Sequence, residues 1–222
     1  MLRENAPGRQ RPRPGRTAGQ PEAGAEGRRS LAAPERQPLR YWSMADIPLT
    51  PSSLVALSPA ALHRLRDTAG AQVLQEAGYA AGEAAYRSFQ AWLPGVAGVD
   101  DPGELAAARL AEMLGRFFVT LGWGAVSATQ LSDAVLAIDS TDWAEAEPAV
   151  NLQYPSCSFT SGFLADFFTR LGDAPLAVME VECRSRGEAR CRWLVGAPES
   201  LTALYDHLAQ GADYLTVLGG PA

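Results

Sequence analysis

The sequence has no lysine, and it is poor in the residues that most active sites and metal sites use. All 19 basic residues are arginines, histidine occurs only twice, and cysteine occurs three times among 222 residues. We interpret the missing lysines as a genome-level bias toward GC-rich codons. No apolar run approaches the roughly 20 residues that cross a membrane as a helix. We therefore predict a cytoplasmic protein without a membrane span.

The net charge of −6 is distributed unevenly along the chain. Residues 1–40 contain nine arginines and four glutamates, which gives +5, so the remainder carries −6 − 5 = −11. An acidic body argues against nucleic acid and against anionic membranes as main partners.

Large apolar residues are almost missing from the first part of the chain. Residues 1–43 are rich in Pro, Gly, Ala and Arg, and such a segment cannot offset its ordering entropy by burial. We predict a disordered tail over 1–43; alternatively, translation starts at Met44. Residues 44–57 form an apolar arm, and residues 58–222 form the folded domain.

The folded part predicts an α+β protein in the order α-α-β-β-α-β-β-α, with an antiparallel sheet of about four strands packed against helices. The predicted helices cover 58–94, about 101–122 and 159–171, and a last helix opens at Pro198. The predicted strands cover 125–131, 135–140, 174–184 and 189–196. Gly78 and Gly82 lie one turn apart in the first helix, and we interpret them as a face on which another helix packs closely.

All three cysteines lie in one stretch, and they indicate a closed metal site. Cys157, Cys183 and Cys191 with one carboxylate supply the four ligands that a structural zinc needs. A hairpin around Gly187 brings the last two cysteines together, and four nearby arginines would balance the charge of the cluster (Arg184, Arg186, Arg190 and Arg192). The alternative is a Cys183–Cys191 disulfide, which an odd cysteine count disfavours.

The carboxylate ligand is ambiguous from the residues alone. Glu180 and Cys183 are three positions apart, so on a regular strand they face opposite sides. Either the strand bulges or ends near Glu182, or Glu182 is the ligand.

The pattern Cys157…Glu180-x-x-Cys183…Gly187…Cys191-x-Trp193 resembles the 4-vinyl-reductase domain family, whose small-molecule-binding fold is shared with TRAPP vesicle-tethering subunits. The resemblance covers roughly residues 58–215. In the aromatic-sensing bacterial regulators of that family, the same Cys, Glu, Cys, Cys order binds a structural zinc. The resemblance therefore implies that Cys157, Glu180, Cys183 and Cys191 are the ligands, and it favours Glu180 over Glu182. Related domains pair through N-terminal segments, which implies a homodimer formed by the arm at 44–57.

Catalytic motifs are few. There is no glycine-rich dinucleotide motif, Walker loop or nucleophile elbow, and nothing resembles a nicotinamide or flavin site. What remains is a set of aromatic residues that could line an apolar chamber between the helices and the sheet, or could equally fill a core: Phe117, Phe118, Trp123, Phe159, Phe163 and Phe167.

The family resemblance favours a chamber. We therefore predict a stand-alone domain that binds a hydrophobic small molecule, a tetrapyrrole intermediate or an acyl chain, for sensing or carriage. The alternatives are an enzyme or accessory factor of bacteriochlorophyll synthesis that acts on a vinyl group, and a ligand-free scaffold.

Overall fold

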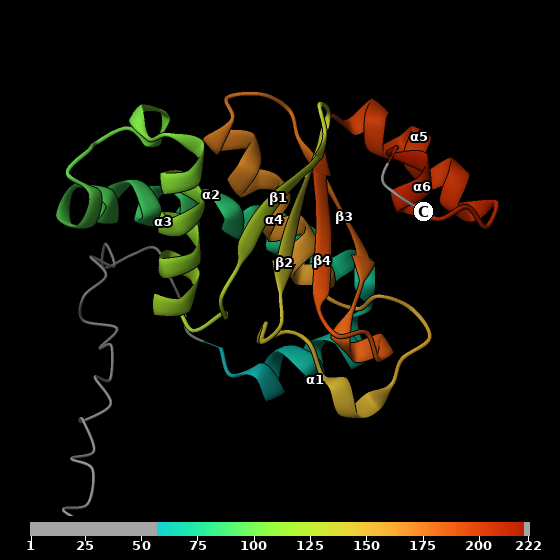
Figure 1. Ribbon diagram of the computed structural model, residues 1–222. Helices are drawn as coiled ribbons and strands as arrows, with labels where there is room; N and C mark the ends of the chain where they lie inside the picture. The colour runs from blue at the N-terminus through green and yellow to red at the C-terminus, as the bar shows by residue number, and fades with distance from the viewer. Residues whose placement is uncertain (1–56, 220–222) are drawn as a thin grey trace, which may run out of the picture. The chain divides into compact units, whose positions relative to one another are not determined.

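The computed structural model describes residues 57–219 (Figure 1). The predicted tail at 1–43 and all but the last residue of the arm at 44–57 lie outside the described residues. The helices within this range are α1 (Pro59–Ala69), α2 (Ala71–Ala97), α3 (Ala107–Thr120), α4 (Ser158–Leu171), α5 (Pro198–Ala209) and α6 (Tyr214–Val217). The strands are β1 (Ser127–Ser132), β2 (Val135–Ser140), β3 (Ala177–Glu182) and β4 (Cys191–Gly196). Short 3₁₀ turns lie at Pro102–Glu104, Pro148–Val150 and Arg184–Arg186.

The four strands form one antiparallel sheet in the order β1-β2-β4-β3. This confirms the predicted α+β class and the four-stranded sheet. The two hairpins, β1–β2 and β3–β4, lie next to each other because β2 pairs with β4.

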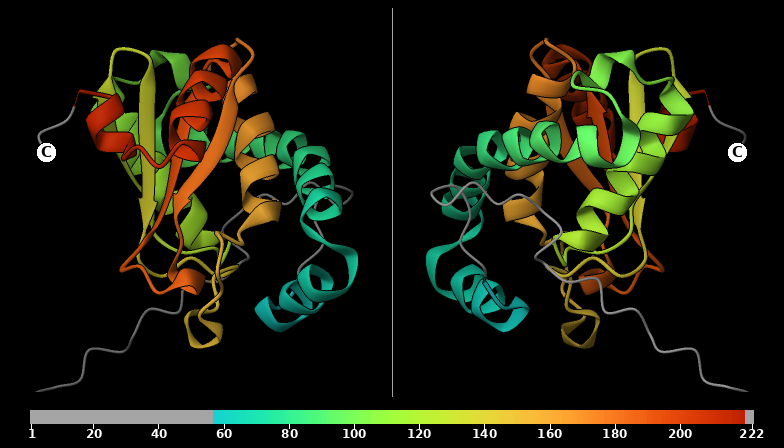
Figure 2. Two further views of the ribbon diagram at one scale, coloured as in Figure 1. Left: turned by 90° about the vertical axis from the view of Figure 1, so that its right-hand side faces the viewer. Right: turned by 90° about the vertical axis from the view of Figure 1, so that its left-hand side faces the viewer.

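Each face of the sheet is covered by different helices (Figures 1 and 2). Ile138, Trp193 and Val195 belong to the main core, which also contains apolar residues of α2, α3 and α4. Ala137 and Leu194 lie on the opposite face, in a smaller core with residues of α5 and α6. The alternation of strand side chains thus supplies two cores from one sheet.

The first predicted helix is in fact two helices. The chain breaks at Gly70, which has φ of 84°, so α1 ends there and α2 begins one residue later. Positive φ is open to glycine because it has no Cβ. The predicted end at Pro94 was also wrong, because α2 continues through this proline to Ala97.

Close packing of α2 against α4 was correctly predicted from the glycines of α2. A Cβ added to Gly78 would lie 2.0 Å from the carbonyl oxygen of Phe159, and one added to Gly82 would lie 2.6 Å from the Cβ of Asp166. Gly162 of α4 makes the reciprocal approach, since its Cβ would lie 1.9 Å from the carbonyl oxygen of Gln75. The two helix backbones therefore touch, and this contact fixes where α4 begins beneath the sheet.

None of the described helices is both long enough and apolar enough to cross a membrane.

Candidate metal centre

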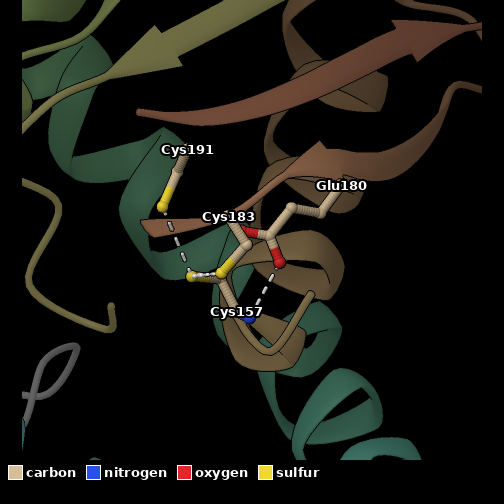
Figure 3. Close-up of side chains that lie close together, drawn as sticks. All are labelled: Cys157, Glu180, Cys183 and Cys191. Carbon is tan, nitrogen blue, oxygen red and sulfur yellow. Dashed lines mark hydrogen bonds between the residues drawn. The ribbon is translucent and has the colours of Figure 1, made fainter. Parts of the chain in front are cut away.

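The three cysteines and Glu180 converge from three elements of the fold (Figure 3). Cys157 is the residue that precedes α4, Glu180 lies in β3, Cys183 directly follows β3, and Cys191 opens β4. Their ligand atoms all lie within 4.8 Å of one another. The side chains predicted to share a site are therefore brought together.

A bulge in β3 explains why Glu180 belongs to this cluster. Glu180 pairs with Trp193 on β4, whereas Glu182 pairs with Arg192, so the register shifts by one residue between the two glutamates. Because neighbouring residues of a strand face opposite sides, the shift places Glu180 and Glu182 on opposite faces of the sheet. Glu182 accordingly bonds to Arg190 and Tyr214. Of the alternatives that the sequence left open, the strand bulges, and Glu180 is the carboxylate in the cluster.

The sulfur atoms lie at distances that fit a shared metal ion. Cys157 Sγ is 3.9 Å from Cys183 Sγ and 3.8 Å from Cys191 Sγ. A tetrahedral zinc with Zn–S bonds of about 2.3 Å places its sulfurs ~3.8 Å apart. A disulfide needs about 2.05 Å, and all three cysteines are free thiols in this structure. The geometry matches a metal site and not the Cys183–Cys191 disulfide.

The Glu180 carboxylate is held by one oxygen and leaves the other without a partner. Oε2 accepts a hydrogen bond of 2.9 Å from the backbone N–H of Cys157. Oε1 is buried and has no hydrogen-bond partner. Because buried polar atoms are nearly always paired, this oxygen is the expected ligand atom. Three sulfurs and one oxygen form a donor set that zinc accepts, so the residues fit the ion that the sequence predicts.

The protonation of the cluster follows from the closeness of its groups. Hydrogen bonds from Cys157 and Cys191 lower the pKa of the Cys183 thiol, while the hydrogen bonds within the cluster and burial raise the pKa of the Cys157 thiol well above its usual value. Burial and the negative charge on Cys183 raise the pKa of Glu180 to about 9. Without metal, one thiolate is therefore shared by two neutral thiols and a neutral carboxyl group.

The arginines of the hairpin do not balance this cluster in the way the sequence predicts. Arg186 pairs with Glu188, Arg190 with Glu182, and Arg192 makes two bonds of 2.6 and 2.7 Å to Asp139. Polar groups closer to the sulfurs take their place: the backbone N–H of Arg184 points to Cys191 Sγ at 3.5 Å, and Ser156 Oγ lies 3.8 Å from Cys183 Sγ. The prediction failed because nearer carboxylates compete for each guanidinium.

Sequence analysis missed a buried carboxylate that supports the site. Glu145 is 1% exposed and accepts hydrogen bonds from the backbone N–H groups of Phe159 and Thr160 and from the Thr160 hydroxyl. It therefore caps α4 directly beside Cys157, although burial raises the pKa of Glu145 to about 7. Its position in a loop with three other acidic residues (Asp142, Glu147 and Asp139) carries no signal that distinguishes it.

The six aromatic residues predicted to line a chamber all lie together. Phe117, Phe118 and Phe167 are fully buried, and Phe163 is 3% exposed. Trp123 is half-buried and stacks on Phe159 and Phe163, with ring centroids 5.7 and 5.6 Å away. Their rings form one contiguous aromatic cluster between α3, α4 and the sheet.

A depression in the surface lies beside the metal centre. It has a volume of about 220 Å³ and lies between α2, the start of α4 and β3. Its lining residues are Gln75, Pro155, Ser158, Ser161, Val178, Met179 and Glu180. Glu180 is thus shared between the depression and the four-residue cluster.

Residues 138–197 match the family model of the 4-vinyl-reductase domain, and this segment contains all four residues of the cluster. The chain therefore carries a domain of this family, as the cysteine and glutamate spacing predicts. The match is shorter than the predicted 58–215.

Two solved structures are similar to this chain. The phenol-responsive sensory domain of the transcription activator PoxR, crystallised with phenol, is 19% identical, with a TM-score of 0.48 over 66% of this chain and 77% of that one. A vinyl-4-reductase family protein from Methanocaldococcus jannaschii is 18% identical, with a TM-score of 0.38 over 61% of this chain and 73% of that one. No curated protein matches this chain.

Proposed function

We propose that this 4-vinyl-reductase-type domain is a zinc-stabilised module that binds a hydrophobic small molecule. The observation that carries the metal assignment is the convergence of three free thiols, 3.8–3.9 Å apart, with a carboxylate whose second oxygen has no other partner. All four donors come from the protein, which is typical of a structural zinc site and leaves no water-filled position for catalysis. The ion would tie the start of α4 to the β3–β4 hairpin.

Zinc content is the first test. Protein purified without added metal is expected to contain about one zinc per chain. Cys191→Ser is expected to lower the free energy of unfolding by several kcal/mol, because the binding energy of a structural metal is also folding energy. A metal-free protein of full stability, or a Cys191→Ser variant that folds normally but loses an activity, would contradict the structural role.

The aromatic cluster is the proposed ligand site. Phe117, Phe118, Trp123, Phe159, Phe163 and Phe167 present a continuous apolar surface between helices and sheet, and an apolar ligand gains roughly 25 cal/mol per Å² of buried surface. We propose a ligand of this class, a tetrapyrrole intermediate or an acyl chain, which the rings would enclose after a modest change in their packing.

Titrations with protoporphyrin IX and palmitate test this proposal. Phe163→Asp would place an unpaired charge among the rings and is expected to abolish binding while zinc content stays at one per chain. Phe163→Leu keeps the site apolar and is expected to weaken binding only a few-fold. No binding by the wild-type chain, or reduction of a vinyl substrate by the purified chain with common reductants, would favour the scaffold or the enzyme instead.

A further inference from the structure

The four residues of the proposed metal centre differ in their access to solvent. Cys157, Cys183 and Cys191 are each 0% exposed. Glu180 is only partly buried and contributes to the wall of the depression described above. Any small molecule that approaches the centre from this side meets Glu180 before it meets a sulfur atom.

Glu180 is also the ligand that is easiest to exchange. A carboxylate is the hardest donor in a set that is otherwise thiolate, and soft ions such as zinc hold thiolates more firmly. When Oε1 leaves the ion, Oε2 can keep its 2.9 Å hydrogen bond from the Cys157 backbone, so the released carboxylate stays anchored. The bulge between Glu180 and Glu182 interrupts the regular pairing of β3 with β4 at this residue. A small movement of Glu180 therefore breaks few other contacts.

The depression has the lining that a small uncharged donor requires. Apart from Glu180 itself, its residues are neutral: two serine hydroxyls, a glutamine amide and apolar groups. A cavity of about 220 Å³ holds several waters, at roughly 30 Å³ of liquid volume each, or one small heterocycle.

We propose that this depression is a second binding site, in which a small neutral nitrogen donor of the imidazole class binds to the metal centre in exchange for Glu180. The metal–oxygen bond to Glu180 breaks and a metal–nitrogen bond forms, with no transfer of protons or electrons. The three thiolates stay in place, and the depression also serves as the path by which the metal enters and leaves. This inference rests on the metal site proposed above.

Cobalt-substituted protein provides the test, with imidazole as the probe. Wild-type protein is expected to show a saturable shift of the cobalt d–d bands with imidazole, while the thiolate-to-cobalt charge-transfer bands keep their intensity. Gln75→Trp places a large ring at the rim of the depression without touching a metal ligand. It is expected to weaken imidazole binding at least tenfold and to slow zinc release to a chelator to a similar degree.

The matched control is Gln72→Trp, the same change one turn away on α2 at an exposed residue outside the depression. It is expected to behave like wild type, and Gln75→Tyr provides a smaller ring should Gln75→Trp fail to fold. Equal imidazole affinity and zinc release in Gln75→Trp and Gln72→Trp would overturn the proposed access site, as would bleaching of the charge-transfer bands by imidazole. If wild-type protein binds neither cobalt nor zinc, the proposed metal site itself fails; if it binds them but imidazole leaves the d–d bands unchanged, only this inference fails.

Discussion

Two glutamates two positions apart in β3 have unrelated roles. Glu180 faces the thiols and has its pKa raised by burial, whereas Glu182 lies on the opposite face of the sheet between Arg190 and Tyr214. Burial acts to raise the pKa of Glu182, but hydrogen bonds from Arg190 and Tyr214 outweigh it and keep that pKa below its usual value. One bulge therefore separates a protonated carboxyl group in the cysteine cluster from an ionised structural one.

The protonation of the cluster predicts that zinc binding releases protons. At pH 7 the metal-free Cys157 and Cys191 thiols hold their protons because their pKa values are raised, Glu180 is protonated because its pKa is about 9, and Cys183 is already a thiolate. One proton from each of the three protonated groups gives about three protons released per zinc. Since these protons compete with the metal, the affinity is expected to rise with pH between about 6 and 8.

Calorimetric titration of zinc in buffers of different ionisation enthalpy measures this number directly. Cys191→Ser should release about one proton fewer, because it removes one thiol from the count. An affinity that stays constant over this pH range would contradict the protonation assigned to the cluster.

At the level of elements, the contact of α2 with α4 controls the position of the metal centre. Cys157 directly precedes α4, and α4 approaches α2 so closely that Gly78 and Gly162 have no room for a side chain. Glu145 holds the same end of α4 through the backbone of Phe159 and Thr160. The first ligand of the site is thus placed by helix packing, and the other three by the hairpin.

Gly162→Ala is expected to destabilise the domain by about 3 kcal/mol or more, because overpacking here would push two helix backbones apart. The added Cβ would lie 1.9 Å from the carbonyl oxygen of Gln75. Gly95→Ala is the matched control, since its Cβ would meet nothing within 4 Å. It should be neutral or stabilising by about 0.5–1 kcal/mol, as alanine favours helix more than glycine does. Urea unfolding measures both, and equal effects of the two variants would contradict the close-packing account.

At the level of the whole molecule, the two faces of the sheet are joined through the hairpin. On the outer face, Arg192 bonds to Asp139 of β2 and to the hydroxyl of Tyr214 of α6, and it is only 7% exposed. Its neighbour Cys191 belongs to the cluster on the inner face. A disturbance of the hairpin therefore reaches both the metal centre and the C-terminal helix.

Assembly is the prediction that belongs to this scale. The apolar composition of residues 44–57 predicts an arm that packs on a second copy and forms a homodimer. Light scattering at micromolar concentration is expected to show a dimer for the full chain and a monomer after deletion of residues 1–57. A full-length chain that is monomeric, with the deletion changing nothing, would indicate that the arm folds over its own domain.

The sequence by itself determined the fold class, the order of the main elements and the members of the four-residue cluster. Apolar periodicity and glycine punctuation are local signals, and the cysteine spacing is specific because so few cysteines are present. The roles of Glu145 and of the hairpin arginines were decided only by tertiary structure, because a buried cap and a competing carboxylate depend on neighbours distant in the chain.

The bulge that separates Glu180 from Glu182 depends on the pairing of β3 with β4. A strand shows its register only against its partner. For the same reason the depression beside Glu180 could not be found in the sequence, since its lining residues come from α2, the start of α4 and β3, which meet only in the folded domain.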